Sequence, residues 1–143
     1  QKYEENPWSI AINEWSFWWG SFNTILGSSQ DMYIGSYLLG MDDDNNIMQD
    51  ALNFILGVNA MRKSYITGFG EDSIRCTFSN IYDGNSPDGF PSGYMPGGIN
   101  SYNGGIISRF PIKCYTDDPG DWFTNENSIY WNAVMVFNTA ALA

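Results

Sequence analysis

The sequence has no histidine among its 143 residues, and this absence excludes several kinds of site. Imidazole is a common general base near neutral pH and the commonest metal ligand, so histidine-based catalytic triads and histidine-ligated metals are excluded. Basic residues are also scarce, because six Lys and Arg stand against 16 Asp and Glu, a formal net charge of -10. Phosphate backbones are bound by clustered Lys and Arg, so we expect no nucleic-acid partner.

Long apolar runs are missing as well. A helix needs about 20 consecutive apolar residues to span a bilayer, and without such a run we expect no membrane partner. A basic segment followed by an apolar one, typical of a signal peptide, is not found on this chain either. The two cysteines, Cys76 and Cys114, form no C-x-x-C motif, so neither a zinc nor a redox site is indicated. They are either free thiols or one disulfide between two loops, which would require an oxidising compartment.

Aromatic residues, by contrast, are abundant. They make up 17% of the sequence, with six Trp, nine Tyr and nine Phe. This content excludes a disordered chain, since disordered segments are poor in aromatics. Each ring buries about 150–250 Å² when it is packed, so two dozen rings would crowd a domain of this size. Some of them therefore line an open groove or pack against protein outside this chain.

Helical spacing of apolar residues predicts three helices, over residues 18–39, 47–56 and 124–142. Gly40 and Gly57 provide stops after the first two. Residues 58–120 are punctuated by glycine and proline, which predicts a long loop region of the kind that carries function. The apolar faces expected to point inward are Trp18, Phe22, Ile25, Leu26, Tyr33, Ile34, Tyr37 and Leu38, then Ile47, Met48, Ala51, Leu52 and Ile55, and finally Ile129, Ala133, Val136, Phe137, Ala140 and Ala141.

Three helices and one long loop region make a poor closed core, because each apolar stripe must be buried against another element. We therefore expect an all-α chain, residues 1–143, that is one portion of a larger helical domain. An acidic run, Asp42 to Asp44, lies between the first two predicted helices. Its spacing does not match an EF-hand calcium loop, so we interpret it as an interhelical loop with Asn45 or Asn46 as helix N-cap.

The most informative stretch is residues 115–133. Asp117, Asp118 and Asp121 crowd a glycine-containing turn, and Glu126 is expected in the first helical turn that follows. Carboxylates at a helix N-terminus stabilise it by capping and by the helix dipole, so a structural role is one interpretation.

A catalytic interpretation of Glu126 rests on its neighbours. Trp122, Tyr130 and Trp131 provide rings nearby, and the aspartates provide like charges. Both surroundings favour the protonated form of a carboxyl group, so Glu126 is expected to hold its proton near neutral pH. A protonated glutamate beside aromatic rings is what the general acid of a glycosidase requires.

This stretch resembles a signature of glycoside hydrolase family 9, the inverting cellulases. The fixed positions of that signature are filled by Tyr115, Asp117, Trp122, Glu126, Ser128, Asn132 and Ala133. Further segments that resemble the family, in the family's order, are Asn6-Pro7-Trp8, Trp19-Gly20-Ser21, residues 54–59, residues 64–70 and Gly97-Gly98-Ile99-Asn100. The resemblance spans nearly the whole chain.

The resemblance implies the C-terminal part of an (α/α)6 toroid, with long Gly/Pro-rich loops lining a cleft. It implies that Glu126 is the general acid, while Asp117, the second candidate catalytic residue, and Asp121 hold the turn and tune Glu126. The family's base comes from an Asp-x-x-Asp segment near the N-terminus of the domain, so this chain alone is expected to be inactive. The implied partners are a β-glucan substrate and the N-terminal remainder of the domain, in a secreted or cell-surface setting. No cofactor is implied, and the resemblance allows calcium, although no ligand set is identified.

One departure from the family concerns sugar binding. The family carries a His-x-Arg segment after Thr-Gly-Phe-Gly, and here only Arg75 lies nearby. Arg75, Trp122, Tyr130 and Trp131 are the candidate substrate-binding residues, although each ring could instead pack between helices. The loop 76–96, with Asp83, Asp88 and Tyr94, is a candidate for reshaping the subsite. Two alternatives stay open: a non-catalytic carbohydrate-binding relative, and a purely structural helical domain.

Overall fold

The computed structural model describes residues 6–41, 46–82, 90–102 and 107–143. Within these ranges the chain has helices but no β-strand, so the predicted all-α class is confirmed. The helices are η2 (Glu14–Ser16), α1 (Ser21–Leu39), α2 (Asn46–Ile55), η3 (Pro111–Lys113), α3 (Trp122–Asn125) and α4 (Ile129–Ala141). No helix of the described ranges is both long and apolar enough to cross a membrane.

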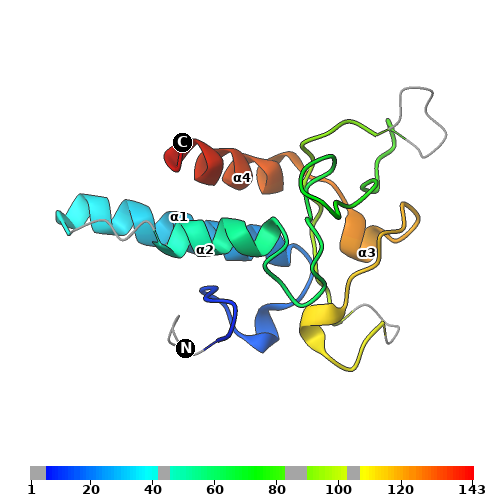
Figure 1. Ribbon diagram of the computed structural model, residues 1–143, viewed down its shortest axis with the longest axis horizontal. Coiled ribbons are helices and arrows are strands. Elements are labelled where there is room, and N and C mark those ends of the chain that lie inside the picture. The colour runs from blue at the N-terminus through cyan, green and yellow to red at the C-terminus, as the bar shows by residue number, and fades with distance from the viewer. Residues whose placement is uncertain (1–5, 42–45, 83–89, 103–106) are drawn as a thin grey trace.

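The three longer helices lie side by side, and the loops gather at one end of them (Figure 1). Helix α1 packs against both α2 and α4. Helix α3 lies at the loop end, next to the start of α1 and α4 (Figure 1). Residues 115–133, which include α3 and the start of α4, therefore lie where the helix ends meet the loops.

The core is built from both the helices and the loops. Phe22, Ile25 and Leu26 of α1 are completely buried, and so are Tyr65 and Met95 of the loops. Because these loop side chains are part of the main hydrophobic cluster, the loop region is packed rather than loosely attached.

A buried polar pair also joins α1 to α4. The Ser29 hydroxyl donates to Asn138 Oδ1 at 2.9 Å, and Asn138 Nδ2 donates to the Leu26 carbonyl at 3.2 Å. Because buried polar groups must be hydrogen-bonded, this pair favours one register between the two helices.

The first two predicted helices agree with the structure to within three residues. The third prediction is wrong, because residues 124–142 do not form one continuous helix. Helix α3 ends at Asn125, Glu126 has extended backbone angles (φ -56, ψ 139), and α4 begins at Ile129. Glu126 therefore lies outside a helical turn. The cause is pairing with loops, since Glu126 and Asn127 form isolated bridges with Phe78 and Pro96.

The predicted inward faces are correct for part of the helices only. The predicted face of α2 is buried, with Ile47 half-buried, and α1 buries its first half. Tyr37 and Leu38 at the far end of α1 are 75% exposed, and Ile129 of α4 is 92% exposed. Helix α4 instead buries Trp131, Met135 and Asn138. The described part of the chain packs against only one side of α1 and of α4. The apolar side chains on the other side are exposed to solvent.

Both cysteines are free, buried thiols, so the disulfide alternative is not supported. The run Asp42 to Asp44 and Asn45 lie outside the described residues, and α2 begins at the other candidate cap, Asn46. Among the described residues, no group of three or more His, Cys, Asp or Glu side chains could hold a metal ion.

Close packing of rings against glycines fixes the junction between α1, α4 and the loops. A Cβ atom built on Gly97 would lie 2.8 Å from Trp131, and one on Gly98 would lie 2.3 Å from the Phe22 ring. Gly98 also has φ +97, a region that side chains rarely adopt. Glycine is therefore required here for both space and backbone conformation.

We predict that Gly98→Ala in the full-length protein lowers stability by at least about 2 kcal/mol, through overpacking and backbone strain. Thermal unfolding measures the loss. Gly35→Ala is the matched control: among the described residues a Cβ on Gly35 in α1 meets nothing within 4 Å and Gly35 lies in an ordinary helix, so a much smaller effect than that of Gly98→Ala is expected. Equal melting temperatures for the two variants would contradict this packing.

Candidate active site

Helix α3 places the residues before Glu126, and Asp121 caps it. The Asp121 carboxylate accepts from the Phe123 backbone N–H at 3.1 Å and from the Thr124 hydroxyl at 2.9 Å. It also accepts a hydrogen bond from the Thr116 hydroxyl. The expectation that Asp121 holds the turn is therefore confirmed, and the mechanism is helix capping.

The backbone around Glu126 is held by loop segments from elsewhere in the sequence. The N–H groups of Phe78, Gly97 and Gly98 donate to the carbonyls of Asn125 at 2.7 Å, Glu126 at 2.8 Å and Thr124 at 2.9 Å. Carbonyls at the end of a helix have no partner inside the helix. Here the loops satisfy them, and the position of Glu126 is set by those loops.

Asn125 anchors this segment from inside the core. Its side chain is completely buried, Oδ1 accepts from the Tyr115 hydroxyl at 2.6 Å, and Nδ2 donates to the carbonyls of Thr116 and Asp118 (3.0 Å to Asp118). Burial raises the pKa of Tyr115 well above its usual range, and the charge of Asp117 raises it further. Tyr115 therefore stays protonated and remains a hydrogen-bond donor.

The side chain of Glu126 has an unusual environment. It is half-buried, and its Oε2 atom is buried without a hydrogen-bond partner among the described residues. A buried carboxyl oxygen normally finds a partner, because leaving it unpaired is unfavourable. The described residues therefore leave one oxygen of this carboxyl group unsatisfied, on a backbone that the loops hold in place.

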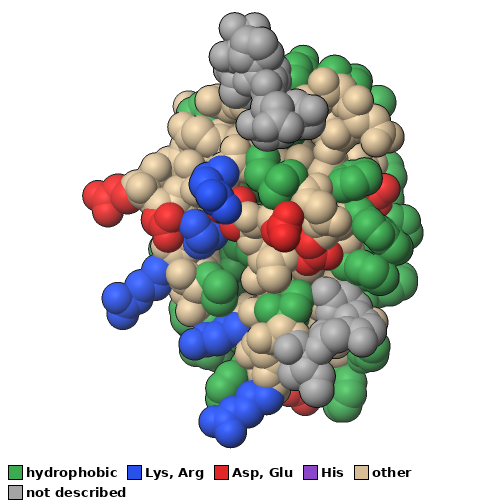
Figure 2. Space-filling model, turned by 90° about the vertical axis from the view of Figure 1, so that its right-hand side faces the viewer, with side chains coloured by type: hydrophobic (Ala, Val, Ile, Leu, Met, Phe, Trp, Pro, Cys, Tyr) green, Lys and Arg blue, Asp and Glu red, His purple; other side chains and the backbone are tan. Residues whose placement is uncertain are grey.

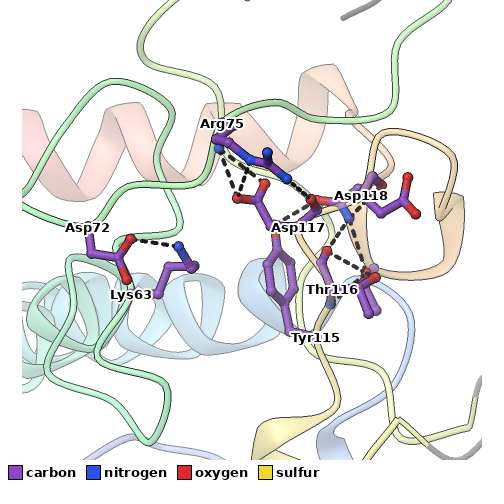
Figure 3. A network of polar contacts seen from close by, with 9 residues as sticks. Lys63, Asp72, Arg75, Tyr115, Thr116, Asp117 and Asp118 are labelled. Carbon is purple, nitrogen blue, oxygen red and sulfur yellow. Dashed lines mark hydrogen bonds and ion pairs between the residues drawn. The ribbon is translucent and has the colours of Figure 1, made fainter.

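Arg75 and Asp117, which are 42 residues apart in sequence, are in direct contact (Figure 3). The Arg75 backbone N–H lies 3.1 and 3.2 Å from the two Asp117 carboxylate oxygens, Arg75 Nε lies 3.4 Å from Oδ2, and Nη2 donates to the Asp117 carbonyl at 3.0 Å. The Arg75 side chain is 79% exposed and that of Asp117 only 15%. Asp117 therefore contacts both the backbone and the exposed guanidinium of Arg75, a pairing that the sequence did not predict.

Cys76 lies beside this pair. Burial raises the pKa of its thiol and the Asp117 charge raises it further, against a smaller lowering by Arg75. A thiol held in its neutral form is a poor nucleophile.

The three predicted aromatic residues have different environments. Trp122 is 45% exposed and Tyr130 59%, whereas Trp131 is only 2% exposed. Trp131 therefore follows the alternative that each ring packs between helices: it belongs to the hydrophobic core and has no free face for a sugar. Trp19, 46% exposed, meets Trp122 edge-to-face at 6.5 Å between ring centroids, and Trp122 stacks on Phe123 at 3.9 Å. Figure 2 shows this end of the molecule, where acidic side chains lie among hydrophobic ones.

Two residues of this region were missed by sequence reasoning. Trp19 was visible only as part of a resembling Trp-Gly-Ser segment, and Asn125 carries neither charge nor ring. Asp83 and Asp88 of the loop 76–96 lie outside the described residues. Tyr94 of the same loop lines a hollow with residues 127–129, directly after Glu126.

Comparisons with known proteins bear on the family and the fold of this chain. A family model described as glycosyl hydrolase family 9 matches residues 4–139. A cellulose 1,4-beta-cellobiosidase from Acetivibrio thermocellus is 31% identical over 87% of this chain and 15% of its own length. A cellodextrinase from Butyrivibrio fibrisolvens is 29% identical over 94% of this chain and 26% of its own length.

A solved structure of AaCel9A in complex with cellobiose-like isofagomine has a TM-score of 0.88 and 26% identity, over 98% of this chain and 28% of that one. The chain thus spans about a quarter or less of the curated relatives' length. The predicted fold is confirmed by the agreement with this structure, and the match to the family model over residues 4–139 shows that the chain belongs to glycosyl hydrolase family 9.

Proposed function

We propose that the complete protein hydrolyses β-1,4-glucosidic bonds in cellulose or a related β-glucan with inversion, and that Glu126 is the general acid. One observation carries this proposal: the buried, unpartnered Oε2 of Glu126, at the family signature position. A proton held on this carboxyl group would be delivered to the glycosidic oxygen as the leaving sugar departs.

The second carboxylate of the reaction lies outside this chain in our proposal. Inverting glycosidases hold acid and base about 6.5–9.5 Å apart, so that a water molecule fits between the base and the sugar. We assign the base to an Asp-x-x-Asp segment in the N-terminal remainder of the domain. The same remainder would cover the exposed apolar sides of α1 and α4, which include Leu38 and Ile129.

Arg75 binds the sugar next to the cleaved bond in this proposal, with Asp117 as its positioning residue. The exposed guanidinium and its contacts with a largely buried carboxylate support this assignment. The exposed rings of Trp122, Tyr130 and Trp19 are suited to stack on sugar units.

A neutral β-glucan substrate is supported by the names of the relatives, a cellobiosidase and a cellodextrinase. The net charge of -10 is also compatible with a neutral polymer and unfavourable for an anionic one. A secreted or cell-surface location is part of the proposal, because an insoluble polymer such as cellulose is met only outside the cell.

The second candidate function is a non-catalytic carbohydrate-binding relative. It is favoured by the absence of histidine, where the family carries a His-x-Arg segment. This candidate predicts that the complete protein binds β-glucan without releasing new reducing ends.

We predict that Glu126→Gln in the full-length protein lowers the rate of hydrolysis of unactivated β-glucan by about 10²–10⁴-fold, the usual contribution of a general acid. Reducing-end release measures the rate, and substrates with very good leaving groups are avoided because they bypass the acid. Glu71→Gln, an exposed carboxylate on a loop, is the matched control and should keep normal activity. Near-normal hydrolysis by Glu126→Gln would overturn the assignment.

A double-mutant cycle tests the Asp117–Arg75 relationship. Asp117→Asn should lower kcat/KM by up to about 10²-fold, because a displaced binding group costs about that much. In an Arg75→Ala background the same change should have little further effect, since coupled residues are not additive. Independent, additive losses would show that Asp117 acts without Arg75.

The proposed remainder of the domain has a separate test. Residues 1–143 expressed alone should expose the apolar sides of α1 and α4 and self-associate, as measured by light scattering and by binding of a hydrophobic dye. Co-expression with the rest of the protein should suppress this association. A monomeric fragment that unfolds cooperatively would contradict the prediction.

A further inference from the structure

Asn132 lies in the first turn of α4, at the end of that helix where the loops gather (Figure 1). It fills a fixed position of the family signature but has no part in the function proposed so far. Asparagine favours a helix interior less than most residues do, because its side chain competes for backbone hydrogen bonds. Here the half-buried side chain of Asn132 bonds groups in a distant loop and in the segment before α4.

In the loop, the Asn132 amide pairs with both backbone groups of Met95. Oδ1 accepts from the Met95 N–H at 2.9 Å, and Nδ2 donates to the Met95 carbonyl at 3.0 Å. Met95 is completely buried in the hydrophobic core, where unpaired backbone groups would be unfavourable. Pro96 comes next and forms an antiparallel bridge with Asn127, but proline has no N–H to donate. The Asn132 amide therefore adds hydrogen bonds where the backbone pairing of this loop is incomplete.

Before α4, the same amide contacts the two residues that directly follow Glu126. Asn132 Nδ2 lies 2.8 Å from Asn127 Oδ1 and 3.0 Å from the Ser128 carbonyl. Ser128 is the N-cap residue of α4, yet its own side chain makes no capping hydrogen bond. The start of α4 and the end of the Glu126 segment are consequently joined through Asn132.

The loop that Asn132 contacts holds Glu126 directly and is itself held in place. The Gly97 N–H donates to the Glu126 carbonyl at 2.8 Å. At the other end of the loop, the Tyr94 N–H donates to Thr67 Oγ1 at 2.9 Å, and the Tyr94 carbonyl accepts from the Thr67 N–H at 3.0 Å. Thr67 is only 1% exposed. Asn132 therefore connects a fixed loop, the Glu126 segment and α4.

A second asparagine of α4 provides a comparison. Asn138 is completely buried and hydrogen-bonds Ser29, the Leu26 carbonyl and the Val134 carbonyl. These partners belong to α1 and to α4 itself. Both asparagines therefore join α4 to another segment, but the contacts of Asn132 are the ones next to the candidate acid.

We propose that Asn132 is a positioning residue for Glu126: its amide ties the loop at Met95 to the residues after Glu126, and this tie holds the carboxyl group where the proton is delivered. The inference rests on the proposed function for the role of Glu126. Asn132 acts through Glu126 rather than by contact with the reacting atoms.

The test measures kcat of the full-length protein on two substrates. Unactivated β-glucan needs a proton on the departing sugar, whereas dinitrophenyl β-cellobioside has a leaving group that departs without one. Asn132→Ala should lower kcat on β-glucan by up to about 10²-fold, the effect of a misplaced catalytic group, and leave kcat on the dinitrophenyl substrate nearly unchanged. Asn138→Ala is the matched control: it should lower the melting temperature and leave the ratio of the two rates unchanged. All rates are measured well below the melting temperatures.

Asn127→Ala is a milder second variant. It removes one acceptor of the Asn132 amide and keeps both contacts with Met95. The same selective loss on β-glucan is expected at a smaller size. This variant decides the question if Asn132→Ala does not fold.

An equal loss on both substrates, or no loss on either, would overturn the inference. The failures of the two proposals are distinguishable. If Glu126→Gln keeps normal hydrolysis of β-glucan, the assignment of the acid fails and the inference fails with it. If Glu126→Gln loses β-glucan hydrolysis selectively but the asparagine variants do not, the proposed function stands and only the inference fails.

Discussion

The structure at the candidate site depends on one set of backbone hydrogen bonds, those that the loops make to residues 124–126. A four-residue helix cannot hold its own end, because its last carbonyls have no partner inside the helix. Phe78, Gly97 and Gly98 provide the missing donors at 2.7–2.9 Å. Glu126 is consequently extended rather than helical, and its carboxyl group occupies a half-buried place that a free helix end could not provide.

The same loops are fixed by close packing, which connects the site to the core. Gly97 leaves room for Trp131 and Gly98 for Phe22, while the Gly97 carbonyl accepts from the Phe22 N–H at 3.1 Å. The start of α1, the start of α4 and the loop thus share one junction. A substitution there would disturb both stability and the position of Glu126, although neither Trp131 nor Phe22 is assigned to the chemistry.

Helix positions were largely predictable because apolar spacing is a local property. The prediction failed for residues 124–142, because Glu126 and Asn127 pair with distant loops and interrupt the helix. Burial was predictable only in part. Trp131 and Tyr130 are adjacent in sequence, yet one is buried and the other exposed, because burial depends on what packs against each side of α4.

The sequence by itself determined the all-α class, the family signature and Glu126 as the candidate acid, because these follow from residue type and spacing along the chain. Only the tertiary structure decided that Asp117 contacts Arg75, that Trp131 belongs to the core, and that Asn132 joins Met95 to Asn127. These facts depend on contacts between segments that are far apart in sequence. Such contacts arise from how helices and loops pack, which no local pattern of residues specifies.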